Sequence, residues 1–282
     1  MPTFDFGAGP VEADQHENGG GWVAATATVD ATAYVDASAQ VFDTAQVRGG
    51  AKLYDTAKVF GSAIVSETAL IYGAAEVRGS AQVRGSAQIY DNAIVDEACI
   101  ISGNAQVYDS AQVYDNAQIS GSAKISATAE VYDNAVVTEN AFIAGSAEVY
   151  GSARVAGSAE VSGSATIRGT AQISGSCKIA GTALIEQEAK VLGSARVTDN
   201  ALLSGSVRVF DSAVIKNDAQ VLGHAKVHGT AEISESAIVR GAAIVKGNSK
   251  VSGTSIIQGR AIIDNMTEVT GSVTVEGGAS LS

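Results

Sequence analysis

The sequence predicts an all-β repeat protein in which short strands alternate with tight turns. Three observations lead to this prediction: an aliphatic residue recurs every six positions, a small residue precedes it by two, and a turn-forming residue follows it by two. The aliphatic series runs from Val23 to Leu281, and all 44 of its positions hold Val, Ile or Leu. No insertion or deletion shifts the phase, so the repeat accounts for nearly all of the 282 residues.

The other positions of the repeat explain the strands and turns. Residues two apart on a strand point to the same face, so the small and the aliphatic residue face inward together and the residue between them faces outward. The turn position holds Gly, Asp or Asn in 34 of 43 repeats, and these residues tolerate a left-handed backbone at the least cost. The small position holds Ala in 36 of 44 repeats, the exceptions being Gly21, Cys99, Cys177, Val207, Ser249, Ser255, Thr267 and Val273.

The unit A-x-[VIL]-x-[GD]-[STN] resembles the hexapeptide repeat of left-handed parallel β-helices, in which an aliphatic residue is followed four positions later by a small one. Val23 and Ala27 match this pattern, and so do the corresponding pairs along residues 21–282. The resemblance implies an all-β, single-stranded left-handed parallel β-helix (a solenoid) of triangular coils, with 18 residues per coil and about 14 coils. The runs of A-x-V-x-G-x are also similar to those of uncharacterised repetitive β-helix proteins of bacteria and phages.

Two regions are expected along the chain. Residues 1–20 lie outside the repeat and would form an N-terminal leader or cap, and residues 21–282 would form the hexapeptide-repeat β-helix. We expect the leader to cover the first coil or to dock to another molecule, with His16–Trp22 as a flexible glycine turn into the first strand. The repeat reaches Leu281 without a capping element, so either the end stacks on another molecule or the chain is a piece of a longer one.

The composition restricts the partners and the compartment. With 30 Asp and Glu against 18 Lys and Arg, the formal net charge of −12 argues against nucleic acid and against anionic membrane surfaces. No apolar run approaches the roughly 20 residues of a membrane span, so membrane insertion is not expected. The first residues lack the basic and apolar segments of a secretory signal. The cytoplasm is therefore the default localisation, although a virion or non-classical export is also compatible.

Outward residues 18 apart should form columns on neighbouring coils. Two such columns lie at corners of the coil, at the position directly after the aliphatic residue, and they contain seven of the eight tyrosines. These are Tyr54, Tyr72, Tyr90 and Tyr108 in one column, and Tyr114, Tyr132 and Tyr150 in the other. Stacked rings stabilise a solenoid by offset packing, and the alternative is an aromatic stripe that binds sugars or another surface. Apolar residues on strand centres predict an interface for side-by-side oligomerisation, with Leu184, Leu202, Ile238 and Ile256 on one face, interrupted by Gln220, and Ile244 and Ile262 on the adjacent face. The alternative is that these side chains only favour strand formation.

Few residues suggest chemistry. Enzymes of the family that the repeat resembles are acyltransferases or carbonic anhydrases that work as trimers, with catalytic or metal-binding histidines in grooves between subunits. This chain has three histidines and no inserted loop; His16 lies in the leader, and His224 and His228 lie in adjacent repeats. No catalytic residue, metal or cofactor is therefore predicted, and an acyltransferase-like enzyme with an intersubunit site at His224 or His228 stays as an alternative.

The remaining reactive side chains have structural interpretations. Cys99 and Cys177 occupy inward positions, where we expect core thiols, and the coils that separate them place them too far apart to bond to each other. Turn aspartates should stack in two places, as the pairs Asp91 with Asp109 and Asp115 with Asp133. Solvated turn carboxylates are favoured there over a shared Ca²⁺ ion.

These observations favour a non-enzymatic protein. The leading hypothesis is a structural or adhesive β-solenoid rod, used as a fibre, spike or scaffold component and acting by self-association as a homo-oligomer or filament, or by binding a protein or glycan partner. Besides the acyltransferase-like enzyme, a carbohydrate-binding rod that uses the tyrosine columns is a further alternative.

Overall fold

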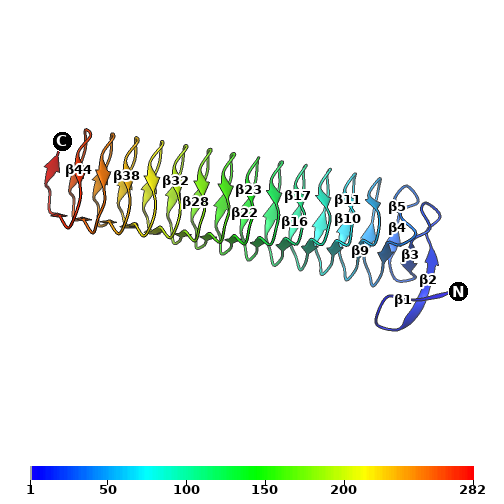
Figure 1. The fold of residues 1–282 in the computed structure, drawn as a ribbon. Helices are drawn as coiled ribbons and strands as arrows, with labels where there is room; N and C mark the ends of the chain where they lie inside the picture. Colours follow the sequence, from blue (N-terminus) through cyan, green and yellow to red (C-terminus); the bar gives the residue numbers. More distant parts are fainter. Residues whose placement is uncertain (1) are drawn as a thin grey trace. The chain divides into compact units, whose positions relative to one another are not determined.

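A computed structural model describes residues 2–282 of the chain (Figure 1). These residues form short strands joined by turns, with no helix among them, and in particular no apolar helix of membrane-spanning length. They divide into two compact units at residues 139 and 140. Each unit is a parallel β-solenoid, and together they contain about 14 turns, each made of three successive repeats of the sequence unit.

The strand boundaries follow the repeat. In the first unit, each strand from β4 (Thr28–Val29) to β22 (Val136–Val137) consists of one outward residue and the aliphatic residue after it. In the second unit, strands of the same kind recur every six positions from β23 (Phe142–Ile143) to β46 (Ser280–Leu281). Two strands of the second unit are longer, namely β33 (Leu202–Gly205) and β36 (Gln220–Gly223).

Within each unit, each strand pairs in parallel with the strand three places further along the chain. This pairing gives three sheets and a triangular coil. In the first unit β4 pairs with β7 (Gln46–Val47), so that Val29 lies beside Val47. In the second unit β30 (Leu184–Ile185) pairs with β33 in the same register, so that Ile185 lies beside Leu203. The register confirms the predicted β-helix-like solenoid with three strands per coil.

The core is the stack of small and aliphatic residues. From Ala33 to Ile263 every such residue is at most 1% exposed, including the two serines that replace Ala at positions 249 and 255. Cys99 and Cys177 are free thiols in this core, as predicted. Burial raises the pKa of the Cys99 thiol to about 12 and that of Cys177 to about 11, which makes both poor nucleophiles at neutral pH.

The turns adopt the left-handed backbone that their composition predicts. Every turn position from Asp43 to Gly277 has a positive φ. The conformation also occurs at six positions where the sequence does not favour it, namely Glu67, Glu97, Ala127, Glu139, Gln187 and Glu235. A left-handed conformation costs such residues about 1–2 kcal/mol each, so the pairing of the flanking strands overrides local preference.

Three turn glycines that precede a bulkier residue at the small position have unusually wide φ angles. Most turn glycines from Gly49 to Gly277 have φ between 65° and 76°. The widest angles precede a bulkier inward side chain, and they are found at Gly175 before Cys177 (90°), Gly205 before Val207 (103°) and Gly271 before Val273 (82°). The wider φ angles at these three turns coincide with the larger inward side chain, and glycine reaches them without strain.

The leader forms an antiparallel hairpin of β1 (Thr3–Asp5) and β2 (Pro10–Gln15), and β2 pairs antiparallel with β3 (Trp22–Ala24). Aromatic contacts fix it to the solenoid, with Phe4 stacked on Trp22 at 4.5 Å and Phe6 on Phe42 at 4.9 Å. The segment His16–Trp22, expected to be flexible, is instead tied to the first coil. It is held there because Val35 exchanges backbone hydrogen bonds with Asn18 and Gly21, of 3.0 and 2.9 Å.

We predict that two turn glycines with the same backbone angle differ in their tolerance of alanine. Gly49 and Gly79 both have φ of 65°. A Cβ atom at Gly49 would lie 3.5 Å from the Glu67 nitrogen, whereas one at Gly79 would lie 2.4 Å from the Glu97 nitrogen. Gly49→Ala should lower the free energy of unfolding by about 1–2 kcal/mol, and Gly79→Ala should cost clearly more. Denaturant titration of the two variants checks this, and equal losses would show that the contact between coils is unimportant.

Candidate interaction surfaces

Three tyrosines of the first predicted column stack face to face. The ring centroids of Tyr72 and Tyr90 are 4.7 Å apart and those of Tyr90 and Tyr108 are 4.9 Å apart, with interplanar angles of 1° and 4°. In the second column, Tyr114 and Tyr132 stack at 4.9 Å and 5°. Because the ring faces contact each other, these columns present mainly ring edges and hydroxyl groups to the solvent.

Two predicted members of the columns make contacts of a different kind as well. Tyr54 packs against Tyr34 at 5.1 Å, with the rings tilted by 39°. Tyr34 is the one tyrosine outside the predicted columns, and the spacing of 18 could not reveal this contact because the two residues are 20 apart. In the second unit, the hydroxyl of Tyr150 accepts a hydrogen bond of 3.3 Å from the Arg168 guanidinium.

At other coils, the same corner positions hold polar side chains that bond to one another. In the first unit, Arg78 donates to Asp96 at 2.7 Å. In the second unit, Arg168 donates to Glu186 at 2.9 Å, and Ser204 donates to the same carboxylate at 2.8 Å. The hydrogen bond from Arg168, helped by that from Ser204, lowers the pKa of Glu186. Corner side chains thus bond to the same corner one coil further along.

The turn carboxylates also act along the stack. Asp91 accepts a hydrogen bond of 3.3 Å from the backbone N–H of Asp109, and Asp109 accepts one of 2.9 Å from Ala127. Asp115 accepts one of 3.1 Å from Asp133. These turn carboxylates are exposed or half-exposed, and Asp91, Asp109 and Asp115 each also accept an N–H group of the next coil, which the sequence did not predict. Among the described residues, no group of three or more His, Cys, Asp and Glu is arranged to hold a metal ion.

The same capping recurs at other turns, where sequence reasoning missed it. The backbone N–H of the residue 18 positions later also donates to Asp43, Asp55, Glu67, Asp199, Asp211 and Glu235. Aspartate at the turn position had suggested only tolerance of a positive φ. Its carboxylate has a second role, as an acceptor for a backbone group that would otherwise lack a partner at the corner.

The predicted apolar residues of the second unit lie side by side. The sheet pairs Leu184 with Leu202, and further along it pairs Ile238 with Ile256, with Gln220 between the two pairs. On the adjacent sheet, Ile244 pairs with Ile262. All six side chains are half-buried, since each is covered in part by its neighbours in the column. We call the four residues Leu184, Leu202, Ile238 and Ile256 the apolar strip, and its role as an interface stays a prediction.

The two candidate histidines have different surroundings. His228 stacks on Phe210 with centroids 4.5 Å apart and an interplanar angle of 6°, and its Nδ1 atom lies 3.8 Å from Asp211. His224 is exposed, and its backbone N–H donates to Gly241 at 2.7 Å. The geometry therefore assigns His228 a packing role in a corner column, of the kind that the tyrosines have in the first unit.

Neither the family models nor the curated proteins give a match to this chain. What the structure shows is thus the solenoid fold, and the likeness to hexapeptide-repeat proteins rests on the repeat itself. Any function has to be argued from the surfaces described above.

We predict that the central tyrosine of the first column makes stability fall at high pH. Desolvation, followed by the neighbouring Tyr72, Tyr108, Asp91 and Asp109, raises the pKa of Tyr90 to about 12. The unfolded chain therefore loses this proton first as the pH rises. The stabilisation is complete below about pH 10 and disappears as the pH passes about 12. Tyr90→Phe keeps the stack and should lose less stability than the wild type over this interval, in denaturant titrations at pH 8 to 12. The same decline in both proteins would contradict the assignment.

A second prediction separates the two histidines. His228→Ala removes a ring from the stack on Phe210 and should lower the free energy of unfolding by about 0.5–1.5 kcal/mol. His224→Ala, at an exposed turn, should change it by less than about 0.5 kcal/mol. His228→Phe serves as the control, because it restores an aromatic ring and should recover most of the loss. Chemical denaturation measures all three variants, and failure of the Phe variant to recover stability would mean that stacking is not the role of His228.

Proposed function

We propose that this protein is a non-enzymatic structural or adhesive β-solenoid, a fibre, spike or scaffold component of the hexapeptide-repeat type that acts by self-association or by binding a partner. The observation that supports this most is the direction of its polar contacts. Arg78, Asp109 and Arg168 each bond to a residue 18 positions further along the chain. Polar groups at the corners and turns thus join one coil to the next. Such contacts are expected of a structural protein, which has to keep a fixed shape.

Self-association through the apolar strip is the favoured route. Its four aliphatic side chains form two pairs of neighbours in one sheet, on either side of Gln220, and are only half-buried within the chain. A second copy that packed on this face would remove the remaining apolar surface from water, which gains roughly 25 cal/mol for each Å² buried. The net charge of −12 opposes such contact between copies, and salt screens this repulsion. Association should therefore strengthen as the ionic strength rises.

The experiment uses a column that already contains a polar residue. Leu202→Gln and Ile238→Gln together would extend the interruption that Gln220 makes, and should weaken self-association at least tenfold. Leu70→Gln is the matched control, since Leu70 is a half-buried outward residue in the first unit between Lys52 and Gln88. Sedimentation velocity and negative-stain electron microscopy at micromolar concentration measure the assemblies.

Two results would refute the route through the strip. One is a wild-type protein that stays monomeric at every concentration and salt level. The other is an assembly that the double variant forms as readily as the Leu70→Gln control does. Denaturation midpoints of all variants establish that any loss of assembly is not a loss of folding.

A further inference from the structure

The first coil has three sheet edges, and two of them are covered. The edge of β3 pairs with β2, so that Ala13 lies beside Ala24 and Gln15 beside Trp22. The edge of β5 (Tyr34–Val35) is covered by residues 18–21, through the two backbone hydrogen bonds at Val35. In addition, the Asn18 side chain donates to the Ala33 carbonyl at 2.8 Å.

The third edge, that of β4, has no such cover. The N–H groups of Thr28 and Asp30 donate to Ala45 and Val47 of the next coil, both at 2.9 Å. Backbone groups alternate in direction along a strand, so the N–H and C=O groups of Val29 and the C=O group of Ala27 point the other way. Within residues 2–282, no hydrogen bond is made to these three groups. They form an unpaired edge of the kind that accepts an added strand.

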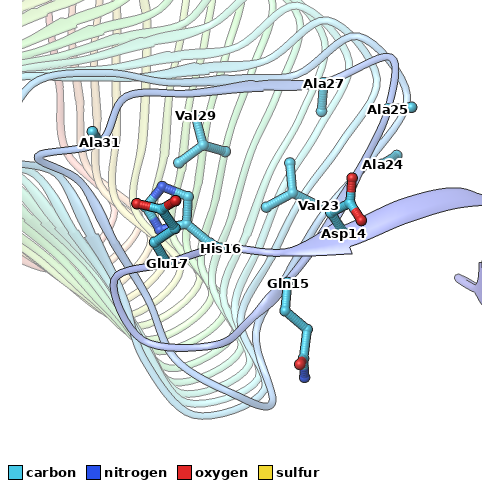
Figure 2. A pocket seen from close by; sticks show the side chains of 10 residues that line it. All are labelled: Asp14, Gln15, His16, Glu17, Val23, Ala24, Ala25, Ala27, Val29 and Ala31. Carbon is cyan, nitrogen blue, oxygen red and sulfur yellow. The ribbon is translucent and has the colours of Figure 1, made fainter. Parts of the chain in front are cut away.

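A hollow opens beside this edge. It has a volume of about 440 Å³, and Val23, Ala27 and Val29 point into it, as seen along the coils in Figure 2. These three residues occupy core positions of the repeat but are half-exposed, in contrast to the buried core positions from Ala33 onward. The hollow thus offers an apolar floor that the described part of the chain leaves half-exposed.

The rim of the hollow is acidic. Asp14 and Glu17 line it, both are exposed, and His16 lies between them in the sequence. Residues 1–47 contain no Lys or Arg and hold seven acidic residues, which are Asp5, Glu12, Asp14, Glu17, Asp30, Asp36 and Asp43. The two exposed carboxylates at the rim therefore favour a cationic partner.

We propose that the β4 edge binds an extended basic segment of a partner protein by strand addition. The segment pairs with Ala27 and Val29, places an apolar side chain in the hollow, and brings Lys or Arg to Asp14 and Glu17. A whole coil of a second copy does not fit there, because β2 and residues 18–21 already occupy the two neighbouring edges. This site shares no residue with the apolar strip, so either can fail without the other.

The test uses a synthetic pentapeptide, Lys-Val-Thr-Val-Lys, with a fluorescent label and the full-length protein. Its fluorescence anisotropy should rise with protein concentration, and the charge-reversed Glu-Val-Thr-Val-Glu should bind at least tenfold more weakly. Added salt should weaken binding of the Lys peptide. Absence of binding at millimolar protein, or equal binding of the two peptides, would refute the proposal.

Two variants address the edge and the rim separately. Val29→Pro removes an N–H group that makes no hydrogen bond within residues 2–282, and should reduce peptide affinity at least fivefold relative to Val29→Ala, which keeps that group. Asp14→Asn with Glu17→Gln should reduce affinity by a similar factor and lower its salt dependence. Glu12→Gln, on the same hairpin but outside the lining of the hollow, is the matched control.

The variants must first be shown to fold, by circular dichroism and by their denaturation midpoints. If Val29→Pro and Val29→Ala bind the Lys peptide equally, strand addition is wrong. If Val29→Pro instead abolishes self-association of the protein and leaves peptide binding unchanged, the edge belongs to a second copy and the proposed basic partner is refuted.

Discussion

The hydrogen-bond register between coils is the constraint on which the rest of the structure depends. A strand N–H group donates to a carbonyl of the next coil, as from Leu70 to Ala87 in the first unit and from Arg196 to Ala213 in the second, both at 2.9 Å. A slip of one residue would turn every inward side chain outward, so the repeat tolerates no insertion. The same register imposes a left-handed turn at each corner, even on Glu67 and Gln187.

Side chains strengthen this register at positions that the backbone ladder leaves incomplete. At the turns, carboxylates such as Asp43 and Asp211 accept N–H groups of the next coil. At the corners, stacked rings and ion pairs repeat the same step from one coil to the next. Each contact contributes little alone, but it acts between neighbouring coils, so the stability of a unit is approximately a sum of nearest-neighbour terms.

Features that repeat with a period of six or 18 could be predicted from the sequence, and features that do not repeat could not. The buried aliphatic series, the left-handed turns and the Tyr72–Tyr108 stack follow from spacing alone. The contact between Tyr34 and Tyr54 joins a strand position to a corner, so no fixed spacing predicts it. The leader has no period at all, and its pairing with β3 emerges only from the fold. The uncovered β4 edge, which follows from that pairing, was equally invisible in the sequence.

The two proposed contact surfaces depend on opposite electrostatics. Copies that meet at the apolar strip carry like charge, so salt favours their association by screening repulsion. A basic segment at the β4 edge is drawn by Asp14 and Glu17, so salt opposes its binding. A regular solenoid directs most of its polar groups toward its own coils. Two surfaces are then left for partners: the apolar strip, which the coils cover only in part, and the β4 edge, which the leader leaves open. Ionic strength therefore distinguishes which of the two surfaces a given partner uses.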